Sequence, residues 1–101
     1  MTWVDAADSS LPDESVVAVE AAGTAIALAK VDGVWHAVET WCTHAECPLS
    51  DGWVEGSAIR CSCHGSLFDL ATGAVVEGPA KEPVRVFPTR VTGDRVEIEV
   101  V

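Results

Sequence analysis

Residues 42–66 read CTHAECPLSDGWVEGSAIRCSCHGS, and this stretch holds all four cysteines and two of the three histidines of the chain. Two clusters lie at its ends, Cys42-Thr43-His44 and Cys61-Ser62-Cys63-His64. Each cluster places a sulfur donor close to an imidazole donor on a single bend of the chain. Two such bends that face each other would form a cage of four metal ligands.

The mixture of donors in each cluster indicates which metal the cage would hold. Thiolate ligands favour zinc or iron–sulfur centres, and imidazole is compatible with both. Structural zinc sites commonly pair cysteines at one spacing and histidines at another, whereas here each cluster mixes the two residue types. The pattern fits a [2Fe–2S] centre in which two cysteines hold one iron and two histidines hold the other. A zinc site and four unconnected residues stay open as alternatives.

The sequence before this stretch predicts β-structure. Asp32-Gly33 lies between two apolar segments, and this dipeptide is typical of a two-residue hairpin because both turn positions require a positive φ. We therefore expect one strand to end near Val31 and the next to run over residues 34–39. We find no convincing period of an amphipathic helix along the chain.

The C-terminal segment predicts a second hairpin. Thr92-Gly93-Asp94 supplies the turn, and residues 95–100 then alternate between polar and apolar side chains. A period of two places every second side chain on one buried face of a strand, here Val96, Ile98 and Val100. The chain is thus expected to be all-β, with a loop-rich insert over about residues 40–80.

The composition limits the class of partner. The chain has 101 residues, with 16 acidic and 6 basic side chains and a net charge of −10. This charge repels nucleic-acid phosphates and anionic membranes, so we expect neither as a partner. No apolar run reaches the roughly 18 residues of a membrane helix, and the start, Met1-Thr2-Trp3, lacks the basic region of an export signal. We expect a cytoplasmic monomer.

The two clusters and their surroundings resemble the Rieske iron–sulfur family. The similar residues are Cys42-Thr43-His44, Leu49-Ser50-Asp51-Gly52, Cys61-Ser62-Cys63-His64-Gly65-Ser66, Phe68-Asp69, Thr72-Gly73 and Gly78-Pro79-Ala80. The resemblance implies a single Rieske domain over residues 1–101, built from three antiparallel sheets. It further implies a cluster-binding subdomain, about residues 40–80, inserted in a base domain of about residues 1–39 and 81–101.

The resemblance also implies roles for individual residues. It implies one [2Fe–2S] cluster, with Cys42 and Cys61 on the buried iron and with His44 and His64 on the outer iron. Ser66 matches the position whose hydroxyl bonds a bridging sulfide and raises the reduction potential. Phe68 stands where high-potential members carry a tyrosine that bonds a ligand sulfur, so we expect an intermediate or low potential.

Cys47 and Cys63 match the positions at which respiratory Rieske proteins carry a disulfide between the two cluster loops. The resemblance therefore implies a disulfide that rigidifies the cage. The alternative is a pair of reduced thiols, as expected for a cytosolic protein. Both states stay open at this point.

The implied function is electron transfer, without catalysis by this chain itself. The resemblance is to ferredoxins that pass single electrons from an NAD(P)H-dependent flavoprotein reductase to a terminal aromatic-ring dioxygenase. The alternatives are a small subunit of another multicomponent enzyme, such as assimilatory nitrite reductase, a ferredoxin for iron–sulfur assembly, and a redox-sensing or structural metal module. Transient docking is expected at the His44–His64 tip, with a rim of Ala45, Glu46, Pro48 and Pro79.

Overall fold

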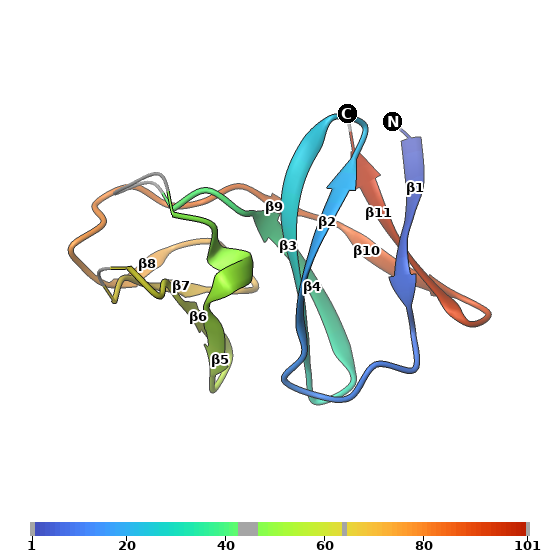
Figure 1. Cartoon of the computed structure of the whole chain (residues 1–101), viewed down its shortest axis with the longest axis horizontal. Helices are drawn as coiled ribbons and strands as arrows, with labels where there is room; N and C mark the ends of the chain where they lie inside the picture. The colour runs from blue at the N-terminus through green and yellow to red at the C-terminus, as the bar shows by residue number, and fades with distance from the viewer. Residues whose placement is uncertain (1, 43–46, 64, 101) are drawn as a thin grey trace.

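The computed structural model describes residues 2–42, 47–63 and 65–100. The ligand candidates His44 and His64, and the rim residues Ala45 and Glu46, lie outside the described residues. Within the described ranges, eleven strands form three antiparallel sheets and one 3-10 turn lies at Leu49–Asp51 (Figure 1). The expected all-β architecture of three sheets is confirmed.

The three sheets follow one another from one end of the molecule to the other (Figure 1). The first sheet has the order β1-β11-β10 and contains Thr2–Asp8, Arg95–Val100 and Thr89–Thr92. The middle sheet has the order β2-β3-β4-β9 and contains Val16–Ala21, Thr24–Val31, Val34–Glu39 and Val86–Phe87. The third sheet has the order β5-β6-β7-β8 and contains Trp53–Glu55, Ala58–Arg60, Leu67–Asp69 and Val75–Glu77.

Both predicted hairpins are present. Asp32 and Gly33 have φ values of 50° and 80°, and they join β3 to β4 with Val31 opposite Val34. The backbone of these two residues has the positive φ that a tight hairpin turn requires. In the second hairpin, β10 pairs with β11, and the alternating side chains of β11 are buried as expected: Val96, Ile98 and Val100.

The middle sheet is buried on both faces. Ile26 and Leu28 of β3 point into a core shared with Ile98 of the first sheet. The intervening residues Ala27 and Ala29 point into a second core, which holds the side chains of the third sheet. Because both faces are covered, the sequence of β3 is an almost continuous apolar run and shows no alternation.

The chain ends lie together at one end of the fold. β1 pairs with β11, and Thr2 is opposite Val100. Figure 1 shows both termini beside the first sheet, at the far side of the molecule from the third sheet. In the described part of the chain, no helix is long and apolar enough to cross a membrane.

His36, on β4, gives the fold an expected pH dependence. Burial lowers the pKa of His36 below its ordinary value of 6.5, against an opposing effect of Asp69. The folded state thus favours the neutral imidazole, and the unfolded state binds more protons as the pH falls. The free energy of unfolding should be greatest above the pKa that His36 has in the unfolded state. It should decrease as the pH falls from that value through the lower pKa of the folded state.

Denaturant unfolding of the wild type and of His36→Gln, at about pH 7.5 and about pH 5.5, tests this expectation. The variant should lose less stability between the two pH values than the wild type. Equal losses in both proteins would contradict a contribution of His36.

Candidate metal centre

The first arm of the candidate site follows the end of β4. The backbone N–H of Cys42 donates to the carbonyl of Cys47 at 3.0 Å, and Trp41 forms an isolated bridge with Pro48. Next to this bridge along both segments, the N–H of Leu49 donates to the carbonyl of Thr40. These contacts close a loop between residues 42 and 47, and they fix the backbone of Cys42 at its base.

The second arm is the loop that joins β6 to β7. The N–H of Cys61 donates to the carbonyl of Ser66 at 2.8 Å, and the N–H of Gly65 donates to the carbonyl of Cys61 at 3.2 Å. The loop over residues 61–66 is therefore closed at its base, like the first loop. Cys61 stands at the point where this loop leaves the sheet.

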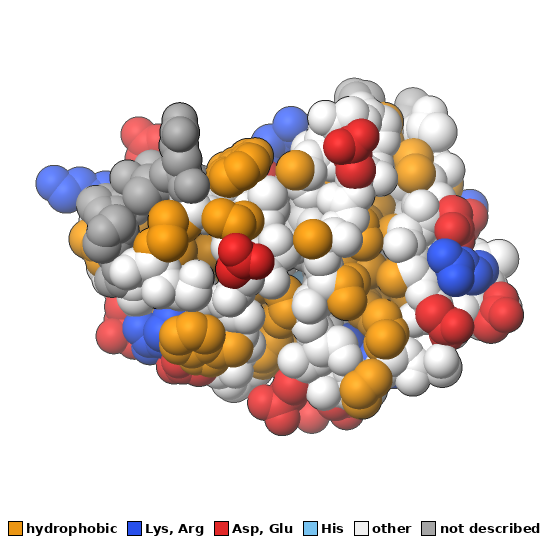
Figure 2. Space-filling model, in the orientation of Figure 1, with side chains coloured by type: hydrophobic (Ala, Val, Ile, Leu, Met, Phe, Trp, Pro, Cys, Tyr) orange, Lys and Arg blue, Asp and Glu red, His pale blue; other side chains and the backbone are white. Residues whose placement is uncertain are grey.

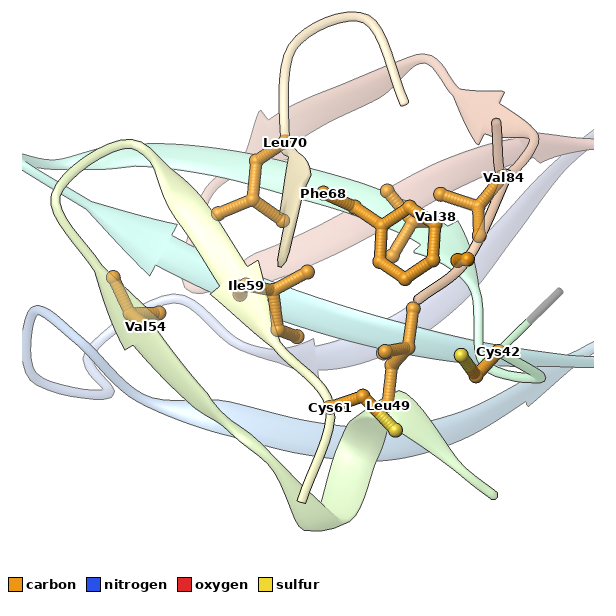
Figure 3. Packing of buried hydrophobic residues seen from close by; sticks show 12 residues of the cluster. Val38, Cys42, Leu49, Val54, Ile59, Cys61, Phe68, Leu70 and Val84 are labelled. Carbon is orange, nitrogen blue, oxygen red and sulfur yellow. The ribbon is translucent and has the colours of Figure 1, made fainter. Parts of the chain in front are cut away.

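The four cysteines separate into two chemical types. Cys42 and Cys61 are free thiols that are 6% and 1% exposed, and both belong to the core of the third sheet. Figure 3 shows them at the same end of that core, close to Leu49. Cys47 and Cys63 form a disulfide that joins the first loop to the second. The structure thus contains the disulfide that the resemblance implied.

The distribution of sulfur atoms tests whether a [2Fe–2S] cluster fits. The sulfurs of Cys47, Cys61 and Cys63 lie within 4.8 Å of one another. A cysteine binds a metal as its thiolate, so the two disulfide-bonded sulfurs of Cys47 and Cys63 are not available as ligands. The free thiols that remain are Cys42 and Cys61, and two is the number of thiolates that a cluster with two histidine ligands requires. The free thiols of the described residues therefore fit the cysteine side of the cluster.

Ser66 connects the second loop to a third segment. Its side chain is fully buried, and the N–H of Ala80 donates to Ser66 Oγ at 3.0 Å. Because the oxygen accepts this hydrogen bond, the hydroxyl hydrogen is still available for donation. Pro79, which precedes Ala80, is exposed, so this segment lies at the surface beside the second loop.

Arg60 is the principal charge beside the second loop, and the sequence argument missed it. Its guanidinium donates to Glu55, Glu77 and the carbonyl of Gly65. The hydrogen bond from Arg60, together with one from Trp53, holds the pKa of Glu55 below its ordinary range. A charged residue in a short strand has no distinctive sequence signal, since most such residues are simply solvated.

Two tryptophans are exposed on the third-sheet side of the molecule. Trp41, which precedes Cys42, is 52% exposed, and Trp53 is 48% exposed. Figure 2 shows hydrophobic side chains exposed at this end of the molecule. An exposed indole beside a candidate ligand offers an apolar contact to a partner.

Comparison with known proteins identifies the family. Residues 2–88 match the model of the Rieske [2Fe-2S] domain. The chain belongs to this family. The fold and the single [2Fe–2S] cluster that the sequence predicted are thereby confirmed for this Rieske protein, and the zinc alternative is wrong.

Similar proteins indicate which class of Rieske protein this chain resembles. The ferredoxin component of the naphthalene 1,2-dioxygenase system of Pseudomonas aeruginosa is 35% identical over 98 residues, which cover 96% of this chain and 94% of the relative. The Sphingomonas yanoikuyae B1 ferredoxin has a TM-score of 0.91 at 31% identity, with 99% of this chain and 100% of that chain covered. A chain in the complex of oxygenase and ferredoxin of carbazole 1,9a-dioxygenase has a TM-score of 0.89 at 28% identity, covering 95% of this chain and 91% of that chain.

These matches extend over nearly the whole of both chains. The relatives are ferredoxin components, which transfer electrons and are not the catalytic oxygenases. The expectation that this Rieske protein is an electron-transfer component and not itself an enzyme is confirmed.

Proposed function

We propose that this Rieske ferredoxin carries single electrons from an NAD(P)H-dependent flavoprotein reductase to the terminal oxygenase of an aromatic-ring dioxygenase system in the cytoplasm. The observation that carries the proposal is the pair of free, buried thiols in two disulfide-linked loops. The full-length similarity to ferredoxin components of dioxygenase systems supports it.

The proposed ligands are Cys42 and Cys61 on one iron, and His44 and His64 on the other. Residues 40–80 are the proposed cluster-binding subdomain, and residues 1–39 and 81–101 the base. When bound, the cluster accepts and returns one electron at a time. Leu49 and Phe68, which are fully buried in the core that contains both cysteines, exclude water from the thiolate side.

Ser66 is proposed to tune the reduction potential. Its oxygen is held by the N–H of Ala80, which leaves the hydroxyl hydrogen for a cluster sulfur. A hydrogen bond to a cluster sulfur stabilises the reduced state, because that state carries more negative charge.

Phe68→Tyr should raise the reduction potential. Phe68 is fully buried in the same core as Cys42 and Cys61 (Figure 3). A hydroxyl at the end of its ring is expected to donate to a ligand sulfur, which favours the reduced cluster. If the hydroxyl found no acceptor, the substitution would cost roughly 1–3 kcal/mol of stability. Redox titration of the visible absorbance measures the potential.

The matched control is Phe87→Tyr, because Phe87 is the second of the two phenylalanines of the chain and belongs to the core between the first and middle sheets. The reduction potential of Phe87→Tyr should equal that of the wild type. An unchanged or lower potential in Phe68→Tyr contradicts the hydrogen-bond argument.

Docking is proposed to be transient, between a monomer and each partner, at the tip formed by His44 and His64. Pro48, Pro79 and the exposed Trp41 would form the described part of the rim. The other proposed rim residues, Ala45 and Glu46, lie outside the described residues. A carrier must dissociate between electron transfers, so its interface should bury less than about 1,200 Å². The net charge of −10 would speed encounter with a basic partner, and association should slow at high salt.

The proposed function is tested with cluster-loaded protein and with reductase and oxygenase proteins of the naphthalene and carbazole systems. NADH and a flavoprotein reductase should reduce the chain, and an oxygenase should reoxidise it while the aromatic product forms. Failure of both oxygenases to reoxidise the reduced chain would contradict the proposal. Purification of the chain as a fixed-ratio subunit of another enzyme, such as a nitrite reductase, would contradict it as well.

A further inference from the structure

All three nitrogens of the Arg60 guanidinium donate hydrogen bonds within the protein. Arg60 is the last residue of β6 and directly precedes Cys61. Nε and Nη2 donate to the two carboxylate oxygens of Glu55 at 2.6 and 2.9 Å, and Nη2 also donates to Glu77 at 3.1 Å. Nη1 donates to the carbonyl oxygen of Gly65 at 2.6 Å. Each of its three nitrogens therefore has a partner, and the partners come from three different segments.

The two carboxylates fix the guanidinium across the third sheet. Arg60 is opposite Leu67 in the β6–β7 register, and Leu67 is opposite Glu77 in the β7–β8 register. The ion pair of Arg60 with Glu77 therefore passes across β7 at Leu67, which is only 7% exposed. The bidentate pair with Glu55 holds the other side of the guanidinium. A guanidinium held at two sides has little freedom to turn.

The contact with Gly65 lies inside the second ligand loop. Gly65 has a φ of 79°, in the left-handed region, and its carbonyl points to the guanidinium. The peptide bond between Gly65 and Ser66 is trans, so its C=O and N–H point in opposite directions. Arg60 has a partly exposed side chain, whereas Ser66 is fully buried. With the carbonyl turned to Arg60, the N–H of Ser66 points away from Arg60.

We propose that Arg60 is a positioning residue, which sets the orientation of the Gly65–Ser66 peptide and thereby the geometry of the second ligand loop. Glu55 and Glu77 act through Arg60, since they hold its guanidinium in place. The inference rests on the proposed function, because it assumes that Cys61 and His64 bind the cluster. Arg60 acts on the cluster through the N–H and hydroxyl groups of Ser66 and through the backbone of Cys61.

A positive charge near a cluster also favours the reduced state without any positioning, so the test must separate charge from geometry. Arg60→Lys keeps the charge, but an ammonium group cannot bridge two carboxylates and a carbonyl in the planar geometry of a guanidinium. Glu77→Gln removes a negative charge, which by charge alone should raise the potential. If positioning dominates, Glu77→Gln should instead lower the reduction potential, because the guanidinium of Arg60 is then held less firmly.

The measurements are made on cluster-loaded protein: the electron paramagnetic resonance (EPR) spectrum after reduction with dithionite, the midpoint potential, and the rate of absorbance loss in the presence of a chelator. Arg60→Lys should shift or broaden the EPR spectrum and speed cluster loss about 10- to 100-fold, the range typical for residues that orient metal ligands. Glu77→Gln should change the spectrum in the same direction by less, with a lower potential.

The matched control is Arg90→Lys. Arg90 also forms a surface ion pair with a glutamate, Glu97, but it lies on β10 of the first sheet. This variant should have the spectrum, potential and cluster lifetime of the wild type.

Three outcomes would overturn the inference: an Arg60→Lys variant identical to the wild type, a Glu77→Gln variant with a raised potential and an unchanged spectrum, or equal effects in Arg90→Lys. A wild-type protein without a Rieske EPR signal would instead contradict the proposed function. The two failures are thus distinguishable.

Discussion

Cys61→Ala should yield a folded protein without a [2Fe–2S] cluster. Cys61 is a free thiol, 1% exposed, at the base of the second loop. Alanine removes the sulfur without burying a polar group, so the fold should persist while one proposed iron ligand is lost. The visible absorbance and the low-temperature EPR signal should both be absent after reconstitution with iron and sulfide. Far-UV circular dichroism checks the fold.

Ser62→Ala is the matched control, since Ser62 is the exposed neighbour of Cys61 within the same loop. This variant should retain the cluster and its spectrum. A Cys61→Ala protein that still assembles a Rieske cluster would show that the ligand assignment is wrong.

Removal of the disulfide should produce the second-largest effect. The bond between Cys47 and Cys63 closes a loop with a sequence separation of 16. A closed loop of that size restricts the unfolded chain by about 3 kcal/mol, which corresponds to a decrease in Tm of roughly 10–20 °C for a domain of this size. The double variant Cys47→Ser/Cys63→Ser should therefore lose its cluster absorbance at a lower temperature than the wild type.

The wild type treated with a thiol reductant serves as the comparison for this variant. If the disulfide is responsible, reduction should lower the wild-type transition to that of the variant, and it should leave the variant unchanged. A double variant as stable as the oxidised wild type would contradict the contribution of the disulfide.

The hairpin of β3 with β4 and the strand β11 could be predicted from the sequence, because local sequence patterns specify them. The Asp32-Gly33 turn and the alternation of β11 each depend on neighbouring residues alone. β1 was not predicted, since its pairing with β11 shifts register between Asp5 and Ala7 and this bulge interrupts the alternation. The residues alone predict only a loop-rich insert at the third sheet, because strands of three residues are too short to show a period. The sheet itself was implied by the family resemblance.

The sequence predicts the donors of the candidate site, but it does not predict the contacts that support them. The spacing of the cysteines and histidines indicated a mixed-ligand iron–sulfur centre. The choice of Cys42 and Cys61 as the proposed ligands, and of Cys47 and Cys63 as a disulfide, came from the family resemblance. The contact of Arg60 with Glu77 joins residues 17 positions apart, and it depends on a sheet register that no local pattern specifies.

The pairing of Thr2 with Val100 has a practical consequence for electron delivery. Thr2 and Val100 lie on the sheet farthest from the loops that carry the proposed ligands (Figure 1). A domain of the proposed reductase, joined there by a flexible linker, should therefore leave the proposed docking site uncovered. Such a tether would keep the donor at about millimolar effective concentration when its length matches the span. A self-sufficient fusion protein could then turn over at dilutions at which the separate proteins rarely meet.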